Sequence, residues 1–182
     1  MSGHVEPEWA MVTVAFVDIR GFTTFADRST AREAAGFLNE FFERAVPVVE
    51  HHGGSVNKFL GDGLLGVFQA PDHADTALAA SLALLDAVEG HCRIGIGLNS
   101  GLVLVGTIGG GGRCELGVVG DPVNVAARVE QATRETGDAV LVTEATRCLL
   151  DGAAARLVPR GTVALKGKAA PVAVYALAGE GR

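Results

Sequence analysis

Apolar and polar positions follow one another along the chain in blocks that predict strands and helices in turn. Residues 11–19 are a run of apolar and β-branched residues, which is typical of a buried strand. A tight connection that contains Gly21 is expected over residues 20–24. From residue 30 to about residue 52, apolar residues recur at helical spacing, so we expect a long helix that ends at Gly53-Gly54.

The start and the interior of this long helix carry signals of their own. Ser29 or Thr30 stands in the position of the N-cap, and Glu33 is placed to complete a capping box. Pro47 has no backbone N–H and should therefore bend or divide the helix.

The stretch Val56–Phe68 is the most distinctive, because it consists of two apolar strands joined at Gly61-Asp62-Gly63. Asp-Gly between apolar runs is a strong hairpin signal, since both residues tolerate a positive φ. Residues 61–66 also match the G-x-G-x-x-G pattern of dinucleotide-binding folds, but that motif must open a helix after a strand. Residues 64–68 instead continue as a strand, so we reject that interpretation.

The second half of the chain repeats this mixture of elements. We expect a helix at 72–88, strands at 92–98 and 102–108 around a turn at 99–101, a loop at 109–112, an extended segment at 114–119, a helix from Asp121 (N-cap) and Pro122 to about Thr136, a strand at 139–143, a short helix at 144–150, and strands near 155–165 and 172–177. This order predicts an α+β sandwich with helices packed on a sheet. One domain is expected over residues 11–178, after a disordered segment at residues 1–10.

Composition narrows the class of protein. The chain has 182 residues, of which 48% are apolar and 20% charged, as in globular domains. Its formal net charge of −6 argues against a broad nucleic-acid surface. Its three cysteines show neither metal-ligand spacing nor a disulfide framework, which fits a cytoplasmic location. No apolar run reaches transmembrane length, so direct membrane insertion is not expected.

Two carboxylates are candidates for chemistry. Asp18 ends the first apolar strand, and a buried carboxylate is usually paired or bound to a cation; the alternative is a cap on the following turn. Asp62 is either a simple turn former or a second acidic group at a neighbouring strand end. Two such groups could share divalent ions, and a pair of metal ions about 3.5–4 Å apart commonly serves in-line displacement at phosphorus.

Groups that could bind an anion surround these carboxylates in the sequence. Lys58 lies four residues before Asp62, where a turn needs no cation. Backbone N–H groups across Ile19–Thr23 could cradle phosphate oxygens. Arg93 enters an apolar strand and Lys166 lies in a turn, and each is a weak signal alone.

Asn124 and Arg128 are four residues apart on a predicted helix and therefore share one face. That face is either an ordinary solvated surface or part of the same site. Taken together, two acidic groups and several scattered cations on an acidic protein suit a metal–triphosphate substrate.

Five blocks in this order resemble the catalytic domain of class III nucleotidyl (adenylyl/guanylyl) cyclases. The blocks are Phe16–Thr23, Lys58–Gly63, Arg93–Ile96, Gly120–Arg128 and Leu165–Gly167. The resemblance covers the chain from about Val12 to Tyr175. It implies a ferredoxin-like (βαββαβ) core and the conversion of ATP to 3′,5′-cyclic AMP and pyrophosphate.

The resemblance also implies a role for each matching position. Asp18, Ile19 and Asp62 would bind two divalent metal ions, Mg²⁺ or Mn²⁺. Substrate would be bound by Lys58 at the adenine ring, by Arg93 and Lys166 at the phosphates, and by Phe22 and Thr23. Asn124 would orient the ribose, and Arg128 would stabilise the transition state at the α-phosphate.

In this family the site forms between two subunits. Asp18, Asp62 and Arg93 would come from one subunit, and Lys58, Asn124, Arg128 and Lys166 from the other. Because this chain carries both sets, a homodimer with two equivalent sites is expected.

One position departs from the adenylyl pattern. Gly117 stands where adenylyl cyclases usually have Asp or Thr as the second reader of adenine, whereas guanylyl-type members often have a small residue there and an acidic residue at the position of Lys58. ATP is the expected substrate. The alternatives are a guanylyl or mixed-specificity cyclase, or a catalytically weak nucleotide-binding regulatory domain.

Overall fold

The computed structural model describes residues 6–110, 113–152, 156–164 and 170–178. The strands are β1 (Glu8–Ile19), β2 (Gly54–Leu60), β3 (Gly63–Phe68), β4 (Ile94–Gly110), β5 (Arg113–Val119), β6 (Val140–Thr143), β7 (Leu157–Val163) and β8 (Val172–Leu177). The helices are α1 (Phe22–Ala26), α2 (Ala31–His51), α3 (His73–Ala87), α4 (Asp121–Thr136) and α5 (Glu144–Arg147).

All eight strands form one sheet in the order β2-β3-β1-β4-β6-β8-β7, with β5 paired to the second half of β4. The pair β4–β6 is parallel and the other described pairs are antiparallel. The order β2-β3-β1-β4 with its intervening helices is the βαββαβ arrangement, so the expected α+β class is confirmed.

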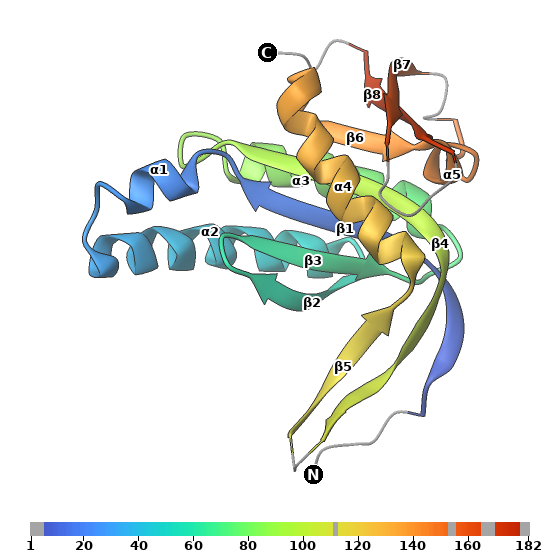
Figure 1. Cartoon of the computed structure of the whole chain (residues 1–182), viewed down its shortest axis with the longest axis horizontal. Coiled ribbons are helices and arrows are strands. Elements are labelled where there is room, and N and C mark those ends of the chain that lie inside the picture. The colour runs from blue at the N-terminus through green and yellow to red at the C-terminus, as the bar shows by residue number, and fades with distance from the viewer. Residues whose placement is uncertain (1–5, 111–112, 153–155, 165–169, 179–182) are drawn as a thin grey trace.

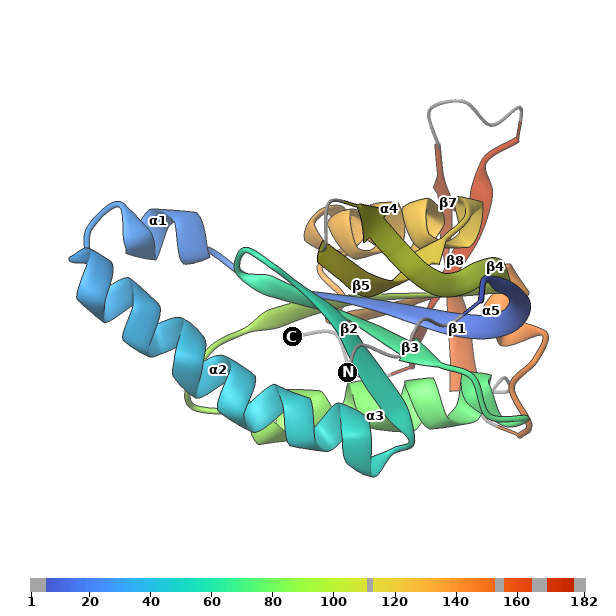
Figure 2. The same ribbon diagram turned by 90° about the horizontal axis from the view of Figure 1, so that it is seen from below.

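Helices cover both faces of the sheet, as Figure 2 shows: α2 and α3 lie on one side and α4 on the other. The larger apolar core lies between the sheet and α2 and α3, and includes Phe41, Phe68 and Ile96. Smaller cores lie under α4, around Val14 and Val129. The site described below is therefore built on a sheet that is held from both sides.

β4 corrects the expected turn at residues 99–101, because the strand is continuous over 17 residues. Asn99 and Ser100 are buried in it, and their side chains find partners on neighbouring elements. Asn99 accepts a hydrogen bond from Thr143 Oγ1 (2.8 Å), and Ser100 Oγ is 2.7 Å from Thr13 Oγ1. Beyond this region, β4 stays paired with β1 as far as Val105, and β4 and β5 then extend from the body as an arm (Figure 1).

The first half of the chain shows smaller differences from the expectations. Strand β1 begins at Glu8, three residues before the expected start, and the expected connection after it contains the short helix α1. Helix α2 has the predicted capping box of Thr30 and Glu33, and Pro47 does not divide it. Pro47 is exposed, so water can reach the backbone carbonyl that loses its intrahelical partner.

Two turn residues also behave differently from the expectation. In the β2–β3 hairpin only Gly61 adopts a positive φ (67°), while Asp62 does not. At the start of α4, Gly120 is the N-cap, and Asp121 is the first helical residue. Neither Asp62 nor Asp121 has a positive φ, so neither is present for its tolerance of that backbone conformation.

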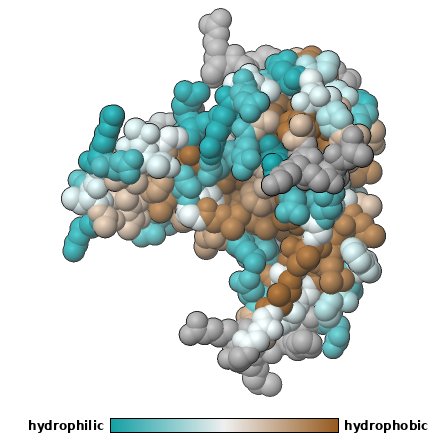
Figure 3. All heavy atoms as spheres, in the orientation of Figure 1, coloured by the Kyte–Doolittle hydropathy of each residue, from teal (hydrophilic) through white to brown (hydrophobic). Residues whose placement is uncertain are grey.

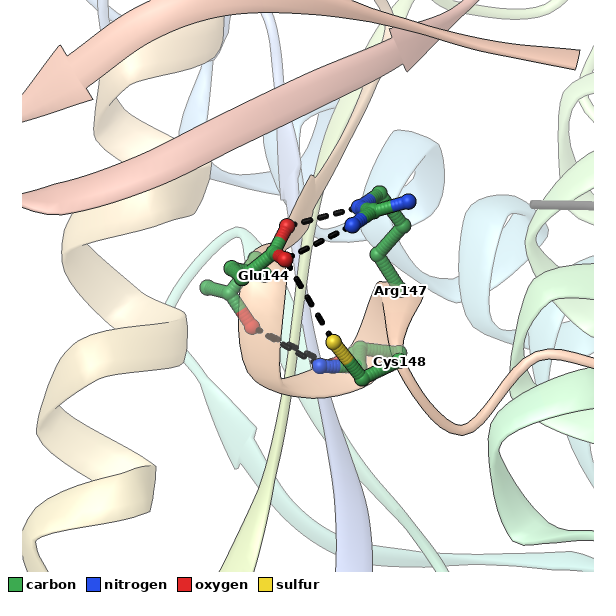
Figure 4. A network of polar contacts seen from close by, with 5 residues as sticks. Glu144, Arg147 and Cys148 are labelled. Carbon is green, nitrogen blue, oxygen red and sulfur yellow. Dashed lines mark hydrogen bonds and ion pairs between the residues drawn. The ribbon is translucent and has the colours of Figure 1, made fainter. Parts of the chain in front are cut away.

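A polar network joins Glu144, Arg147 and Cys148 within and just after helix α5 (Figure 4). Glu144 accepts hydrogen bonds from Arg147 at 2.6 and 2.7 Å and from Cys148 Sγ at 3.4 Å. The Arg147 guanidinium also lies 5.0 Å from the centre of the Tyr175 ring on β8. Hydrogen bonds from Arg147, and then Tyr175, lower the pKa of Glu144 to about 2. The network is well paired, which indicates a structural role.

Candidate active site

Asp18 and Asp62 lie at the same end of the sheet. Strand β1 runs between β3 and β4, so Asp18 is opposite Gly63 on one side and Gly95 on the other. The N–H of Ile19 donates to the carbonyl of Asp62 at 3.3 Å, which holds the hairpin turn beside the end of β1. Gly63 is required there, because a Cβ atom would lie 2.2 Å from the carbonyl oxygen of Val17.

The carboxylate of Asp18 is partly shielded from water and forms an ion pair with Arg134 of α4. Burial, followed by repulsion from Asp62, raises its pKa above the ordinary value, and Arg134 acts in the opposite direction. A cation placed beside both carboxylates would offset the repulsion that raises the pKa of Asp18. Carboxylate oxygen is also the ligand type that Mg²⁺ and Mn²⁺ prefer.

Glu130 is a third acidic group of the site, and the sequence analysis missed it. It is buried on α4, and burial, followed by the charge of Asp18, raises its pKa to about 7. The signal that could have found it is periodicity, because Ala126, Glu130 and Thr133 fall on the buried face of the helix. A carboxylate on such a face is unusual unless it is paired or functional.

A small hollow of about 210 Å³ opens at these groups. Asp18, Leu60, Gly63, Glu130 and Arg134 are among the residues that line it. Among the described residues, no cluster of three or more His, Cys, Asp or Glu side chains is arranged to hold a metal ion. Mg²⁺ is commonly held by one or two carboxylates together with substrate phosphates, and the pair Asp18 and Asp62 suits that manner of binding.

Fewer backbone N–H groups over Ile19–Thr23 are available to bind phosphate than the sequence indicated. The N–H groups of Ile19 and Arg20 already donate to the carbonyls of Asp62 (3.3 Å) and Arg93 (2.8 Å). The candidates that remain are the N–H groups at the start of α1, where helical N–H groups have no partner within the helix. Thr23 is exposed there, whereas the ring of Phe22 packs 6.0 Å from that of Phe37.

Two arginines besides Arg134 lie at this end of the sheet, and their side chains make different contacts. The guanidinium of Arg20 donates to the carbonyls of Thr133 (3.0 Å) and Asp138 (2.9 Å), and thereby ties the end of β1 to the end of α4. Arg93 is exposed and reaches a larger cavity of about 770 Å³, which Arg20 also lines. Arg93 is thus the one of the two whose side chain is free to meet an anion from solvent.

Lys58 lies on β2 and is paired with Glu115 of β5, with Nζ 2.5 Å from Oε1. Beside them, the Asn57 amide donates to the carbonyl of Leu116 at 2.8 Å. Gly117 follows on β5 and is buried, and these two contacts bring the strand of Lys58 against the strand of Gly117.

Asn124 and Arg128 are both exposed on α4, as their spacing predicted. The helix is seated closely on β4 by glycines: a Cβ at Gly97 would lie 2.2 Å from the N atom of Glu130. The buried Asn99 donates to the carbonyl of Pro122 at 3.0 Å and so anchors the turn that carries Asn124.

Within one chain, neither of these two side chains lines the hollow at Asp18, which α4 borders with Ala127, Glu130, Gln131 and Arg134. Asp18 meets α4 at Arg134, which is ten residues beyond Asn124, or about 15 Å along the helix axis at about 1.5 Å per residue. The remaining expected phosphate ligand, Lys166, lies outside the described residues.

No described helix has the length and apolar character needed to cross a membrane.

Comparison with known proteins assigns the family. Residues 5–179 match the family model of the adenylate and guanylate cyclase catalytic domain. An uncharacterized protein of Mycobacterium tuberculosis is 38% identical over 169 residues, covering 88% of this chain, and this chain spans only 30% of that relative.

Solved structures of both specificities are similar to this one. The adenylyl cyclase CyaB from P. aeruginosa has a TM-score of 0.85 and 26% identity, over 94% of this chain and 95% of that one. The guanylyl cyclase Cya2 has a TM-score of 0.83 and 31% identity, over 99% of this chain and 96% of that one. The chain belongs to the family of adenylate and guanylate cyclase catalytic domains.

Proposed function

We propose that this domain is an adenylyl cyclase that converts ATP to 3′,5′-cyclic AMP and pyrophosphate at sites shared between two copies of the chain. The observation that carries the proposal is the meeting of Asp18 and Asp62 at one end of the sheet, with Asn124 and Arg128 exposed elsewhere on the same chain. This arrangement supports a metal–triphosphate site whose residues come from two copies of the chain.

Asp18 and Asp62 would hold two divalent ions, together with the backbone of Ile19. Their fit rests on the raised pKa of Asp18, to which Asp62 contributes, and on the oxygen ligands that they supply. Divalent ions held by these residues would supply Lewis-acid activation of the ribose 3′-hydroxyl and neutralise charge on the phosphates.

The chain's own side chains position the nucleotide and neutralise its charge. Arg93 and Lys166 bind phosphate oxygens. Phe22 and Thr23, at the start of α1, lie next to the bound phosphates. Asn124 orients the ribose, and Arg128 donates to the α-phosphate as negative charge develops there. Such positioning and charge stabilisation supply most of the catalysis that a protein can give to phosphoryl chemistry.

A homodimer follows from the separation of these groups within one chain. Bringing Asn124 of one copy to Asp18 of another assembles a site that neither copy holds alone, and a two-fold axis gives two such sites.

An apolar face is available for the contact between the two copies. Strand alternation places on one face of β1, β4 and β5 the exposed side chains of Trp9, Met11, Leu102, Ile108 and Val119. Figure 3 shows apolar surface extending along the β4–β5 arm.

The choice of ATP rests on Lys58, whose ammonium can donate to N1 of adenine. Gly117 has no side chain that could accept a hydrogen bond from the adenine amine, so a guanylyl or mixed-specificity cyclase is the second candidate. Its support is the similar guanylyl cyclase structure. Turnover of ATP and GTP, each with Mg²⁺ and with Mn²⁺, decides between them, and a higher kcat/KM for GTP would contradict the adenylyl assignment.

Complementation tests the shared site directly. Asp18→Ala and Arg128→Ala should each be inactive, and mixing them should restore activity, because a mixed dimer has one site with both groups intact. Random pairing gives about a quarter of the wild-type activity. A mixture as inactive as its components would rule out a shared site. Absence of cyclic product from the metal-loaded wild-type dimer would instead favour a regulatory nucleotide-binding domain.

A further inference from the structure

Glu115 is the charged partner of Lys58, although the two residues are far apart in the sequence. Lys58 Nζ lies 2.5 Å from Glu115 Oε1, with 37% of the lysine side chain and 61% of the glutamate side chain exposed. The Asn57–Leu116 hydrogen bond of 2.8 Å holds β2 against β5 at the same point. The pair is therefore fixed at its base and open to solvent at its polar ends.

The neighbouring position 117 offers no polar group. A Cβ on Gly117 would lie 2.3 Å from Ile108 Cδ1, so the Ile108 side chain covers this position. Ile108 is the cross-strand neighbour of Glu115, and Glu115 and Gly117 are two residues apart on one strand. All three positions thus share one face, on which Glu115 carries the carboxylate.

Lysine and glutamate side by side form a complementary pair of hydrogen-bonding groups. An ammonium only donates, and an ionised carboxylate only accepts. The Watson–Crick edge of adenine presents the reverse pair, because N1 accepts and the 6-amine donates. A base that lies against Lys58 would therefore have its amine within reach of Glu115.

We propose that Glu115 is the second purine-reading residue of this domain. Its carboxylate accepts a hydrogen bond from the 6-amine while Lys58 donates to N1, and Ile108 covers the place left by Gly117. This inference rests on the proposed function, since it assigns a substrate contact to the same site. It makes the bound base a 6-aminopurine.

An analogue without the amine tests the contact. ATP and purine riboside triphosphate, which has hydrogen at position 6, are compared on the wild type, Glu115→Ala and Glu115→Gln, and GTP is assayed alongside them. Glu115→Ala should lower kcat/KM for ATP about ten- to a hundredfold, as expected for a hydrogen bond to a charged group. It should change kcat/KM for the analogue less than about twofold. Glu115→Gln, which keeps an acceptor oxygen, should lie between. Glu43→Ala, an exposed glutamate on α2, is the matched control and should behave as wild type.

Three results would overturn the inference. An equal loss of kcat/KM with ATP and with the analogue would show that Glu115 acts only by positioning Lys58. No loss with either would show that it has no part in binding. A loss confined to GTP would show that the carboxylate reads guanine.

Calorimetric titration of the same nucleotides keeps the inference separate from the proposed function. Binding of ATP that weakens in Glu115→Ala, without a matching change for the analogue, supports the contact even if the wild type forms no cyclic product. That combination would remove the proposed activity and leave the assignment of Glu115.

Discussion

The guanidinium of Arg134 forms an ion pair with the carboxylate of Asp18, and thereby joins the last turns of α4 to the end of β1. Arg134 is the more exposed partner, with 57% of its side chain accessible against 20% for Asp18. The arginine lowers the electrostatic cost of keeping Asp18 ionised beside Asp62. A metal ion at Asp18 would share the carboxylate with Arg134 or replace it.

Asp18→Ala should abolish metal-dependent turnover and leave the fold intact. We expect kcat to fall by about 10²-fold or more, because the variant loses an ionised group at the reaction centre. Folding should tolerate the change, since burial and Asp62 both disfavour the charge. Turnover with Mn²⁺ and the thermal midpoint are measured together, and Asp27→Ala on the surface is the control. Normal activity in Asp18→Ala would rule out the metal site proposed here.

Arg134→Ala should shift the metal dependence without abolishing activity. An exposed ion pair contributes about 0.2–1 kcal/mol, so removing this competing cation should lower the half-saturating metal concentration by up to about fivefold. Titration of activity with Mn²⁺ measures the shift. Arg32→Ala, on the exposed start of α2, should leave the titration unchanged. A requirement for more metal in Arg134→Ala would show that Arg134 helps to hold the site open for the ion.

Glu130 should make the metal-free protein less stable as pH rises. Its pKa of about 7 in the folded protein lies above the ordinary 4.5, so the folded state binds the proton more tightly. The resulting stability is fully present below pH 4.5 and is lost as pH rises through 7. Glu130→Gln should therefore match the wild type at low pH and exceed it at pH 8 by about 1–3 kcal/mol.

Denaturant unfolding of wild type and Glu130→Gln across this pH range, with a chelator present, measures the difference. Parallel stability curves for the two proteins would mean that folding does not raise the pKa of Glu130.

Gly97→Ala should destabilise the domain and lower turnover. The added Cβ would lie 2.2 Å from the N atom of Glu130 and 2.5 Å from the carbonyl oxygen of Ala126, both of them backbone atoms that can move only if α4 moves. Overpacking of this kind costs about 1–3 kcal/mol, and a displaced α4 also displaces Asn124 and Arg128.

The matched control for this change is Gly36→Ala on α2. A Cβ there meets nothing within 4 Å, so it should stabilise the protein by about 0.5–1 kcal/mol through helix propensity. Chemical denaturation and turnover of both variants are compared. Equal stability of Gly97→Ala and wild type would contradict the close seating of α4 on β4.

Local features were predictable from the sequence because their physical causes are local. The capping box of Thr30 and Glu33 is formed by residues three apart, and the Val56–Phe68 hairpin by a short turn between apolar runs. The amphipathic spacing that exposes Asn124 and Arg128 on α4 is equally local. Five ordered motifs then identified the family, which the family match confirms.

The continuous β4 could not be predicted, because Asn99 and Ser100 are turn-forming residues whose partners are distant. Thr13 and Thr143 satisfy their side chains only after β1, β4 and β6 have come together. The N–H groups of Ile19 and Arg20 likewise donate hydrogen bonds to the carbonyls of Asp62 and Arg93 on neighbouring segments.

Most elements, the class of fold and the family were predictable from the sequence, since these depend on periodicity, turn chemistry and ordered motifs. Only the tertiary structure decided which charges meet: Asp18 with Arg134 and beside Glu130, and Lys58 with Glu115. Electrostatic and hydrogen-bonding energies depend on distance and burial in space. Lys58 and Glu115 are far apart in the chain, so they interact only when folding has brought the strands that carry them together.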